Sequence, residues 1–246
     1  MKPTKLIYLE HMQQLTCDAQ VEAIEPENEK TAVYLDQTVF YPQGGGQPFD
    51  TGMITSSTAT FIVDEVRYIE GAVAHKGHFQ HGTFAPHEMV HCMVDSIRRS
   101  LNARLHSAGH VVDMAVESLP LSWEPTKAYH FPDSPYVEYT GNLDTMNVDE
   151  LQNTIQQLCN SYIEQNLPVS CRFVSLTELK QLCKHVPANF ANLAPEKPIR
   201  IVLIDTFAVP CGGTHIRSLQ ELGSMVITKI KKKGDTIRVG YDVVRR

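Results

Sequence analysis

The chain has 246 residues, which is long enough to bury a substantial core and to form one large domain or two modest ones. Its formal net charge of -6 and pI near 6.0 exclude a global basic field, so any contact with nucleic acid must use local basic patches. The sequence contains neither a signal-peptide-like apolar run nor a run of about 18 apolar residues, which predicts a soluble cytoplasmic protein that does not associate with membranes.

Six cysteines are scattered along the chain without a CxxC pair. This pattern is typical of reduced thiols rather than of a disulfide framework. Five of them are expected to act as small buried apolar residues, and only Cys211 has neighbours that suggest chemistry.

Short β-like runs separated by turn residues fill residues 1–94. The runs at 32–41, 58–69 and 72–79 are divided by Gly, Pro and Asp, most densely in the segment PQGGGQPFDTG. Strands of this length with such connections predict an antiparallel barrel-like domain.

From about Asp95 onward, apolar residues recur at spacings of three and four, which predicts one long amphipathic helix. Asp95 or Ser96 is the expected N-cap, and Pro120 is the expected stop. The apolar stripe consists of Ile97, Leu101, Leu105, Ala108, Val112, Ala115 and Leu119.

The rest of the chain mixes helix and strand patterns. They predict a helix at about 148–166, a strand at 168–176, a short helix at 177–183, a strand at 199–207, and a hairpin at 224–244 that turns at 233–235. The predicted fold class is α+β, with an N-terminal antiparallel β-barrel-like domain over residues 1–94 and an α+β domain over residues 95–246.

The first of three candidate metal sites is the segment from His87 to His91, which matches the HExxH pattern of zinc peptidases. In such enzymes the two histidines share a helix face and the glutamate, here Glu88, is the general base. The pattern has two free positions and arises readily by chance, and no third ligand follows at a peptidase spacing. Exposed histidines at the start of a strand or helix are the favoured interpretation.

The second candidate consists of His75, His78 and His81, which alternate with Gly and polar residues in a segment typical of a hairpin loop. Surface histidines of this kind commonly bind metals only weakly. The favoured interpretation is therefore a loop without a metal.

The third candidate combines two distant pairs of residues. His106 and His110 stand four residues apart on the predicted long helix, so both imidazoles can reach one ion. In the segment CGGTH, the glycines allow Cys211 and His215 to converge on one point. Together the pairs offer one sulfur and three nitrogens, a tetrahedral set that suits zinc. Taken alone, an HxxxH pair is more often two ordinary helix histidines, and CGGTH is compatible with a simple turn.

Three segments carry a resemblance to a known family: FYPQGGGQPFDTG at 40–52, HSAGH at 106–110, and CGGTHIRSLQELG at 211–223. They resemble the alanyl-tRNA editing proteins of the AlaX family, which is related to the editing domain of alanyl-tRNA synthetase. The match spans nearly the whole chain and is similar to the medium-length members. In that family the segment MVHCMVD (89–95) corresponds to the end of a barrel strand, in contrast to the helical pattern that it also fits.

The resemblance implies a free-standing hydrolase, an aminoacyl-tRNA deacylase, that removes wrongly attached serine, and in some members glycine, from alanine tRNA. It assigns His106, His110, Cys211 and His215 as the ligands of one zinc ion. It also implies the acceptor end of tRNA(Ala) as the partner, and no obligate protein partner is inferred. Because four protein ligands resemble a closed zinc site, two roles stay open: one ligand yields to water or substrate, or the ion mainly positions substrate.

Editing is needed because a pocket for alanine excludes glycine poorly and rejects serine by only roughly 10–200-fold. A second site can spare alanine by requiring a partner for the serine hydroxyl. The candidates for lining this pocket and for catalysis are Ser107, Gln47 and Thr214. The candidates for admitting substrate and supplying N–H groups to the oxyanion are Gly45, Gly46, Gly212 and Gly213.

Two basic clusters are the local features available for RNA. One is the lysine run of Lys229, Lys231, Lys232 and Lys233, and the other consists of Arg98, Arg99 and Arg104. The lysines are equally typical of an edge hairpin, where charge discourages strand pairing, and the arginines are equally typical of a solvated helix face.

Two rival functions stay open from the residues alone. One is an HExxH metallopeptidase, whose activity would depend on Glu88. The other is a non-catalytic tRNA-binding module with a structural zinc.

Overall fold

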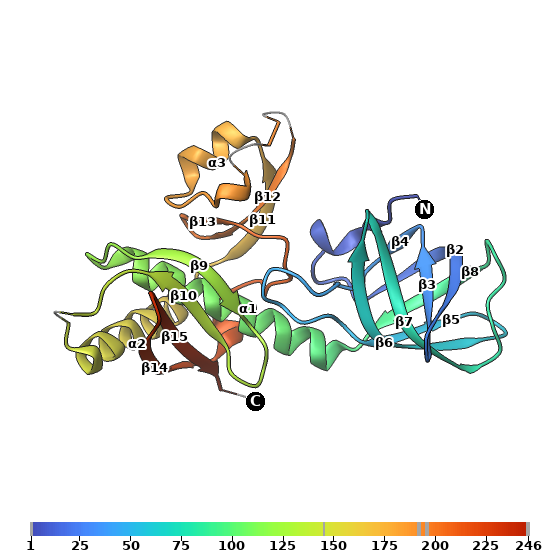
Figure 1. Cartoon of the computed structure of the whole chain (residues 1–246), viewed down its shortest axis with the longest axis horizontal. Coiled ribbons are helices and arrows are strands. Elements are labelled where there is room, and N and C mark those ends of the chain that lie inside the picture. Colours follow the sequence, from blue (N-terminus) through green and yellow to red (C-terminus); the bar gives the residue numbers. More distant parts are fainter. Residues whose placement is uncertain (1, 145, 191–192, 195–196, 245–246) are drawn as a thin grey trace. The chain divides into compact units, whose positions relative to one another are not determined.

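The chain folds into two compact units, Met1–Leu101 and Asn102–Arg246 (Figure 1). The structure is a computed structural model that describes residues 2–144, 146–190, 193–194 and 197–244. Within these ranges no helix is long and apolar enough to span a membrane. The long helix α1 (Ser96–Ser118) contributes residues to both units.

The first unit is built around a closed antiparallel barrel with the strand order β2-β3-β7-β6-β5-β8. Side chains alternate between core and solvent along these strands; in β8, Val90, Cys92 and Val94 are buried and the residues between them are exposed. The strands are β1 (Lys5–Leu6), β2 (Thr16–Glu27), β3 (Lys30–Leu35), β4 (Gln37–Thr38), β5 (Gly52–Thr55), β6 (Thr60–Ile69), β7 (Ala72–His81) and β8 (Met89–Val94), with a short 3-10 helix η1 (Ile7–Leu9). The predicted antiparallel barrel is confirmed.

The helical interpretation of the segment with the HExxH pattern is wrong. Met89–Val94 is the strand β8, which pairs antiparallel with β2 and β5. His87 precedes this strand with a left-handed φ of 65°, and Glu88 accepts a hydrogen bond from the backbone N–H of Ala85 at 2.7 Å. The two histidines therefore do not share a helix face, and this segment lacks the geometry of a zinc peptidase.

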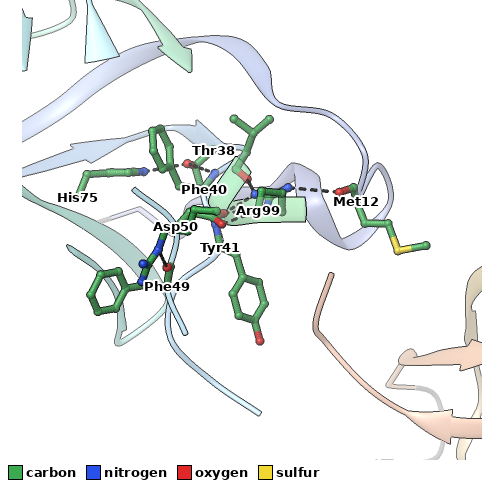
Figure 2. A network of polar contacts seen from close by, with 10 residues as sticks. Met12, Thr38, Phe40, Tyr41, Phe49, Asp50, His75 and Arg99 are labelled. Carbon is green, nitrogen blue, oxygen red and sulfur yellow. Dashed lines mark hydrogen bonds and ion pairs between the residues drawn. The ribbon is translucent and has the colours of Figure 1, made fainter. Parts of the chain in front are cut away.

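A buried ion pair joins Arg99 at the start of α1 to Asp50 in the loop before β5 (Figure 2). The two side chains are 3% and 0% exposed. Arg99 also donates to the backbone carbonyls of Met12 at 3.2 Å and Val39 at 2.6 Å, and Asp50 accepts from the N–H of Tyr41 at 2.7 Å. The structure corrects the expectation that Arg99 contacts RNA, because its guanidinium is enclosed and occupied by these partners.

The Gly-rich loop between β4 and β5 is a tight turn. The Tyr41 hydroxyl donates to the Gly44 carbonyl at 2.9 Å, and the Gln47 N–H donates to the same carbonyl at 2.9 Å. Gly45 and Gly46 adopt φ values of 53° and 78°, which residues with a side chain rarely take. Both glycines are thus required by the turn itself, and Gln47 is fully buried within it.

The second unit contains two antiparallel sheets in addition to most of α1. One has the strand order β14-β15-β10-β9 and the other β11-β12-β13. The elements are β9 (Glu124–Tyr129), β10 (Tyr136–Thr140), α2 (Val148–Glu164), β11 (Val169–Val174), α3 (Leu176–Leu182), η2 (Ala188–Phe190), β12 (Ile199–Ile204), β13 (Phe207–Pro210), η3 (Leu219–Leu222), β14 (Met225–Lys233) and β15 (Thr236–Val243). Helix α2 lies beside the edge strand β14 (Figure 1), where the Gln156 side chain bonds to the backbone of Met225 and Ile227.

Helix α1 begins where the sequence predicts. Asp95 is its N-cap, since its carboxylate accepts the N–H groups of Ile97 at 2.9 Å and Arg98 at 3.1 Å. The predicted stripe is buried from Leu105 to Ala115, but Ile97 is 80% exposed, so its assignment to the core stripe is wrong. The first turn of the helix is solvated on that side.

The predicted helices α2 and α3 and the hairpin of β14 and β15 are confirmed. The predicted strand at 199–207 is two strands, β12 and β13, joined by a turn at which Asp205 has a φ of 52°. Strands β9 and β10 were not predicted. Their first member is mostly polar and exposed, so it lacks the alternation that marks a strand in a sequence.

His75 is fully buried in β7 and makes two hydrogen bonds. Its Nδ1 donates to the Val33 carbonyl at 2.9 Å, so its Nε2 accepts from the Thr38 hydroxyl at 2.8 Å. Burial lowers the pKa of His75 to about 4. His78, on the same strand, is exposed. The predicted hairpin loop is wrong, because His75, His78 and His81 all lie in the strand β7; the group of possible metal ligands found among the described residues does not include them.

Replacing His75 with Gln is expected to weaken the acid sensitivity of the barrel. The folded state favours the neutral imidazole, so the unfolded chain binds more protons as the pH falls from the ordinary pKa of 6.5 toward 4. Above that pH range the neutral His75 contributes its full stabilising free energy to folding. This contribution, about 3 kcal/mol in total, is lost as the pH falls through the range. Urea unfolding of the wild type and of His75→Gln at several pH values between about 7 and 4 measures the difference.

The matched control is His78→Gln, which removes an exposed histidine from the same strand. It should change the pH dependence of unfolding much less than His75→Gln does, because its side chain, beside Asp64, is exposed to solvent. Identical pH dependence in the wild type and His75→Gln would contradict the assignment of the acid sensitivity to His75.

Candidate metal centre

Four side chains from two distant segments meet in the second unit. His106 and His110 lie one turn apart on α1, and Cys211 and His215 lie in the loop after β13. One potential ligand atom from each lies within 4.8 Å of the others. The Cys211 sulfur is 3.4 Å from His106 Nε2 and 3.3 Å from His215 Nε2. The structure thus brings together the two pairs that the sequence singled out, and the cluster could hold a metal ion.

The histidines of the cluster are enclosed by protein. His106, His110 and His215 are 1%, 6% and 0% exposed, whereas Cys211 is only partly buried. His110 Nε2 is buried without a hydrogen-bond partner in the described part of the chain. Buried ring nitrogens are normally paired, so this atom, set beside a sulfur and two further imidazoles, fits a bound cation.

Residues outside the cluster contact the Nδ1 atoms of two of its histidines. His110 Nδ1 lies 3.3 Å from a carboxylate oxygen of Asp113, whose second oxygen accepts the Tyr139 hydroxyl at 2.7 Å. His215 Nδ1 lies 3.1 Å from the Ser107 hydroxyl. Such contacts fix the ring orientation and leave Nε2 for a metal, as is usual for metal-binding histidines.

Ser107 does not line an open pocket, in contrast to the sequence-based expectation. It is fully buried, and besides contacting His215 it accepts the Ile216 N–H at 3.2 Å. The hydroxyl that was assigned to the substrate therefore orients one of the potential ligands. This makes Ser107 a positioning residue.

Electrostatics within the cluster favour metal-binding protonation states for three of the four groups. Burial, together with the neighbouring charges, holds the pKa values of His106 and His215 well below their usual range. Burial alone would raise the pKa of the Cys211 thiol, but His110 and Arg200 outweigh it and lower this pKa. Burial would lower the pKa of His110, but Asp113 and the Cys211 sulfur raise it to about 9. Neutral imidazole and deprotonated sulfur are the forms that bind metals.

His130 packs against the cluster and was not anticipated. Its ring stacks on His106 with centroids 4.3 Å apart, and its Nδ1 lies 2.5 Å from the Tyr241 hydroxyl, which donates to the Leu105 carbonyl. A Cβ on Gly109 would lie 2.4 Å from His130 Cε1. The glycine of the HSAGH segment therefore provides the space for His130, and a glycine inside a predicted helix was the signal that could have indicated this close approach.

Arg200 of β12 is the second residue that the sequence did not single out. It is 7% exposed and donates to the Cys211 carbonyl at 2.6 Å, so it holds the CGGTH loop and places a positive charge beside it. A single arginine in an apolar strand gives no spacing pattern that would have revealed this contact.

The glycines of the CGGTH loop have different surroundings. The Gly213 N–H donates to the Cys211 sulfur at 3.3 Å, so it is not available to an oxyanion as expected. Gly212 is exposed, and a Cβ there would meet no atom within 4 Å. The space beside the partly buried Cys211 is therefore open. Thr214 is fully buried.

The remaining predicted site residues lie at several places. Gly45, Gly46 and Gln47 belong to the turn of the first unit, and Arg98 donates to the Phe49 carbonyl and stacks on the Phe49 ring. Arg104 donates to the carbonyls of Glu221, Leu222 and Val244, which ties α1 to the C-terminal part of the second unit rather than presenting the guanidinium to RNA. Lys231, Lys232 and Lys233 are exposed on β14.

Two family models match the chain. The model described as tRNA synthetases class II (A) matches residues 4–98, and the one described as threonyl and alanyl tRNA synthetase second additional domain matches residues 199–238. Each half of the chain thus contains a segment that matches a model of tRNA synthetases.

Comparison with individual relatives shows to which family of synthetase-related proteins the chain belongs. The alanyl-tRNA editing protein AlaX-M of Methanosarcina barkeri is 30% identical over 224 residues, which are 89% of this chain and 90% of that protein. AlaX-L of Pyrococcus horikoshii is 27% identical and is covered over 53% of its length. An alanine–tRNA ligase of Methanoregula boonei is 30% identical over 96% of this chain, which spans only 25% of the ligase. The chain belongs to the family of alanyl-tRNA editing proteins, as its motifs predicted.

The substitution Gly109→Ala is expected to destabilise the second unit by about 1–3 kcal/mol, because the added methyl group overpacks against His130 and the Tyr241 hydroxyl. Gly212→Ala is the matched control, since its methyl group enters open space and should change stability by less than about 0.5 kcal/mol. Chemical unfolding of both variants measures the difference. Equal stability of the two variants would show that Gly109 is not needed for the packing of His130.

Proposed function

We propose that the protein deacylates mischarged alanine tRNA, hydrolysing the ester of Ser-tRNA(Ala), with Gly-tRNA(Ala) as a second substrate. The observation that carries the proposal is the buried group of three histidines and one cysteine in a chain whose relatives are named as alanyl-tRNA editing proteins. In this proposal residues 1–94 form the barrel domain and residues 95–246 form the editing domain.

One zinc ion is the proposed cofactor, held by His106, His110, Cys211 and His215. One sulfur and three imidazole nitrogens are a donor set that zinc favours, and the orphaned Nε2 of His110 supports it. When bound, such an ion supplies a positive charge that polarises the ester or holds the substrate. The exposed Gly212 next to Cys211 supports approach of the substrate from this side.

The chain itself contributes space, orientation and charge. Open space at Gly212 admits the aminoacylated end of the tRNA beside the cluster. Arg200 fixes the loop and adds positive charge where negative charge develops on the ester. Thr214 stays the proposed partner of the serine hydroxyl. In the first unit, Gln47, Gly45 and Gly46 stay proposed contacts of the tRNA substrate.

RNA contacts in this proposal come from Arg98 and the lysines of β14, namely Lys231, Lys232 and Lys233. The exposure of the three lysines on an edge strand supports contact with phosphates. Arg99 and Arg104 are left out, because each guanidinium bonds to several acceptors within the protein, whereas Arg98 is half-buried and donates from Nε to the Phe49 carbonyl.

Deacylation of Ser-, Gly- and Ala-tRNA(Ala) tests the function directly. The wild type should release serine much faster than alanine. Cys211→Ala should lose more than about 100-fold in rate, because losing a ligand exceeds the roughly 10–100-fold typical of losing an outer partner. Zinc content and melting temperature, measured in parallel, separate lost chemistry from lost folding.

Glu88→Gln is the control, because a peptidase would need this carboxylate and the proposed deacylase does not. It should leave serine release unchanged. Failure of fully zinc-loaded wild type to release serine, in an assay in which a known editing domain succeeds, would contradict the proposal. Binding of tRNA without turnover, with loss of folding in His106→Ala, would instead indicate a binding module with a structural zinc.

A further inference from the structure

The outer face of the four-stranded sheet carries an ordered row of residues. Tyr129 of β9 pairs with Tyr136 of β10, Tyr136 pairs with Gly240 of β15, and Gly240 pairs with Lys229 of β14. Directly paired residues point to the same face of a sheet. This row therefore runs from two aromatic rings, across a glycine, to a lysine.

The aromatic end of the row is a stack of rings. The rings of Tyr129 and Tyr136 are stacked with centroids 5.6 Å apart, and Phe131 stacks on Tyr129 at 4.4 Å and 8°. The Arg238 guanidinium lies 4.2 Å from the centre of the Tyr136 ring and is held there by Glu138 at 2.5 Å. Stacked rings and a guanidinium plane are the surfaces on which unpaired nucleobases stack.

Gly240 lets the side chain of Thr228 approach the middle of the row closely. A Cβ at this position would lie 2.7 Å from Thr228 Oγ1 and 3.5 Å from Lys229 Cγ. A groove with a volume of about 430 Å³ lies on this face, and its lining includes Tyr129, Tyr136, Lys229, Lys231, Arg238 and Gly240.

Charge is distributed unevenly along the groove. Lys229 and Lys231 line it from β14, and Asp242 of β15, which pairs with Val226, also lines it. Lys232, between Lys231 and Lys233, points to the opposite face by the alternation of the strand and lies 3.9 Å from Asp144. At the aromatic end Asp133 accepts the Tyr129 hydroxyl at 3.1 Å. The lysine end is thus suited to a phosphate, and the aromatic end to a base.

We propose that this groove binds an unpaired nucleotide of RNA, with the base stacked on the Arg238 guanidinium plane that covers Tyr136 and the adjoining phosphate paired with Lys229 and Lys231. The assignment of that RNA to tRNA rests on the proposed function; the stacking site itself does not. The proposal also separates the lysine run into two faces. Lys229 and Lys231 contact the nucleotide in this groove, and Lys232 faces away from the groove.

Fluorescence anisotropy with a labelled single-stranded oligoadenylate tests the site. A length of about ten nucleotides lies within the roughly 4–16 that single-strand sites cover. Tyr136→Ala should weaken binding about 5-fold or more without changing its salt dependence, whereas Tyr136→Phe, which keeps the ring, should bind as the wild type does. The double variant Lys229→Gln, Lys231→Gln should weaken binding and lower the slope of log K against log salt by roughly 1.4.

Lys232→Gln removes the same charge from the other face and should bind as the wild type does. No binding by the wild type, or equal loss in Lys232→Gln and the double variant, would overturn the proposal. If Tyr136→Ala lowers the melting temperature, the proposal is judged instead by the slope of log K against log salt in the lysine variants. Serine release by the wild type is measured separately. A wrong deacylase proposal would show as no serine release, and a wrong groove proposal would show as no oligoadenylate binding.

Discussion

The second unit depends on keeping three imidazoles and a thiol together where protein encloses the histidines. An unpaired ring nitrogen opposes folding in such a place, so the surrounding residues define which nitrogen faces the centre. Ser107 holds the outer nitrogen of His215, and Asp113 holds that of His110. Within the described part of the chain, His110 Nε2 has no hydrogen-bond partner. The arrangement could hold a cation.

Both sheets of this unit contribute to the cluster. His130, in the connection between β9 and β10, stacks on His106, and the glycine at position 109 leaves room for its ring. Arg200, from the three-stranded sheet, holds the backbone of Cys211. Gly212, beside Cys211, is exposed and takes no part in these contacts. Packing and ligand geometry are therefore set by the same few residues.

Local spacing predicted much of this structure. The i, i+4 pair of His106 and His110, the long helix, the barrel and the C-terminal hairpin all follow from periodicity and turn residues. Spacing did not predict the positions that depend on tertiary contacts. No sequence pattern shows that His130 contacts the cluster, or that the hydroxyl of Ser107 contacts His215. The HExxH match failed because strand pairing with β2 and β5 overrides a helical pattern.

X-ray absorption at the zinc edge tests the metal centre most directly. Zinc-loaded wild type should show one sulfur at about 2.3 Å and three nitrogens at about 2.0–2.1 Å. The sulfur shell should vanish in Cys211→Ser. A wild-type spectrum with only nitrogen and oxygen neighbours, or a protein that retains far less than one zinc ion per chain, would contradict the account.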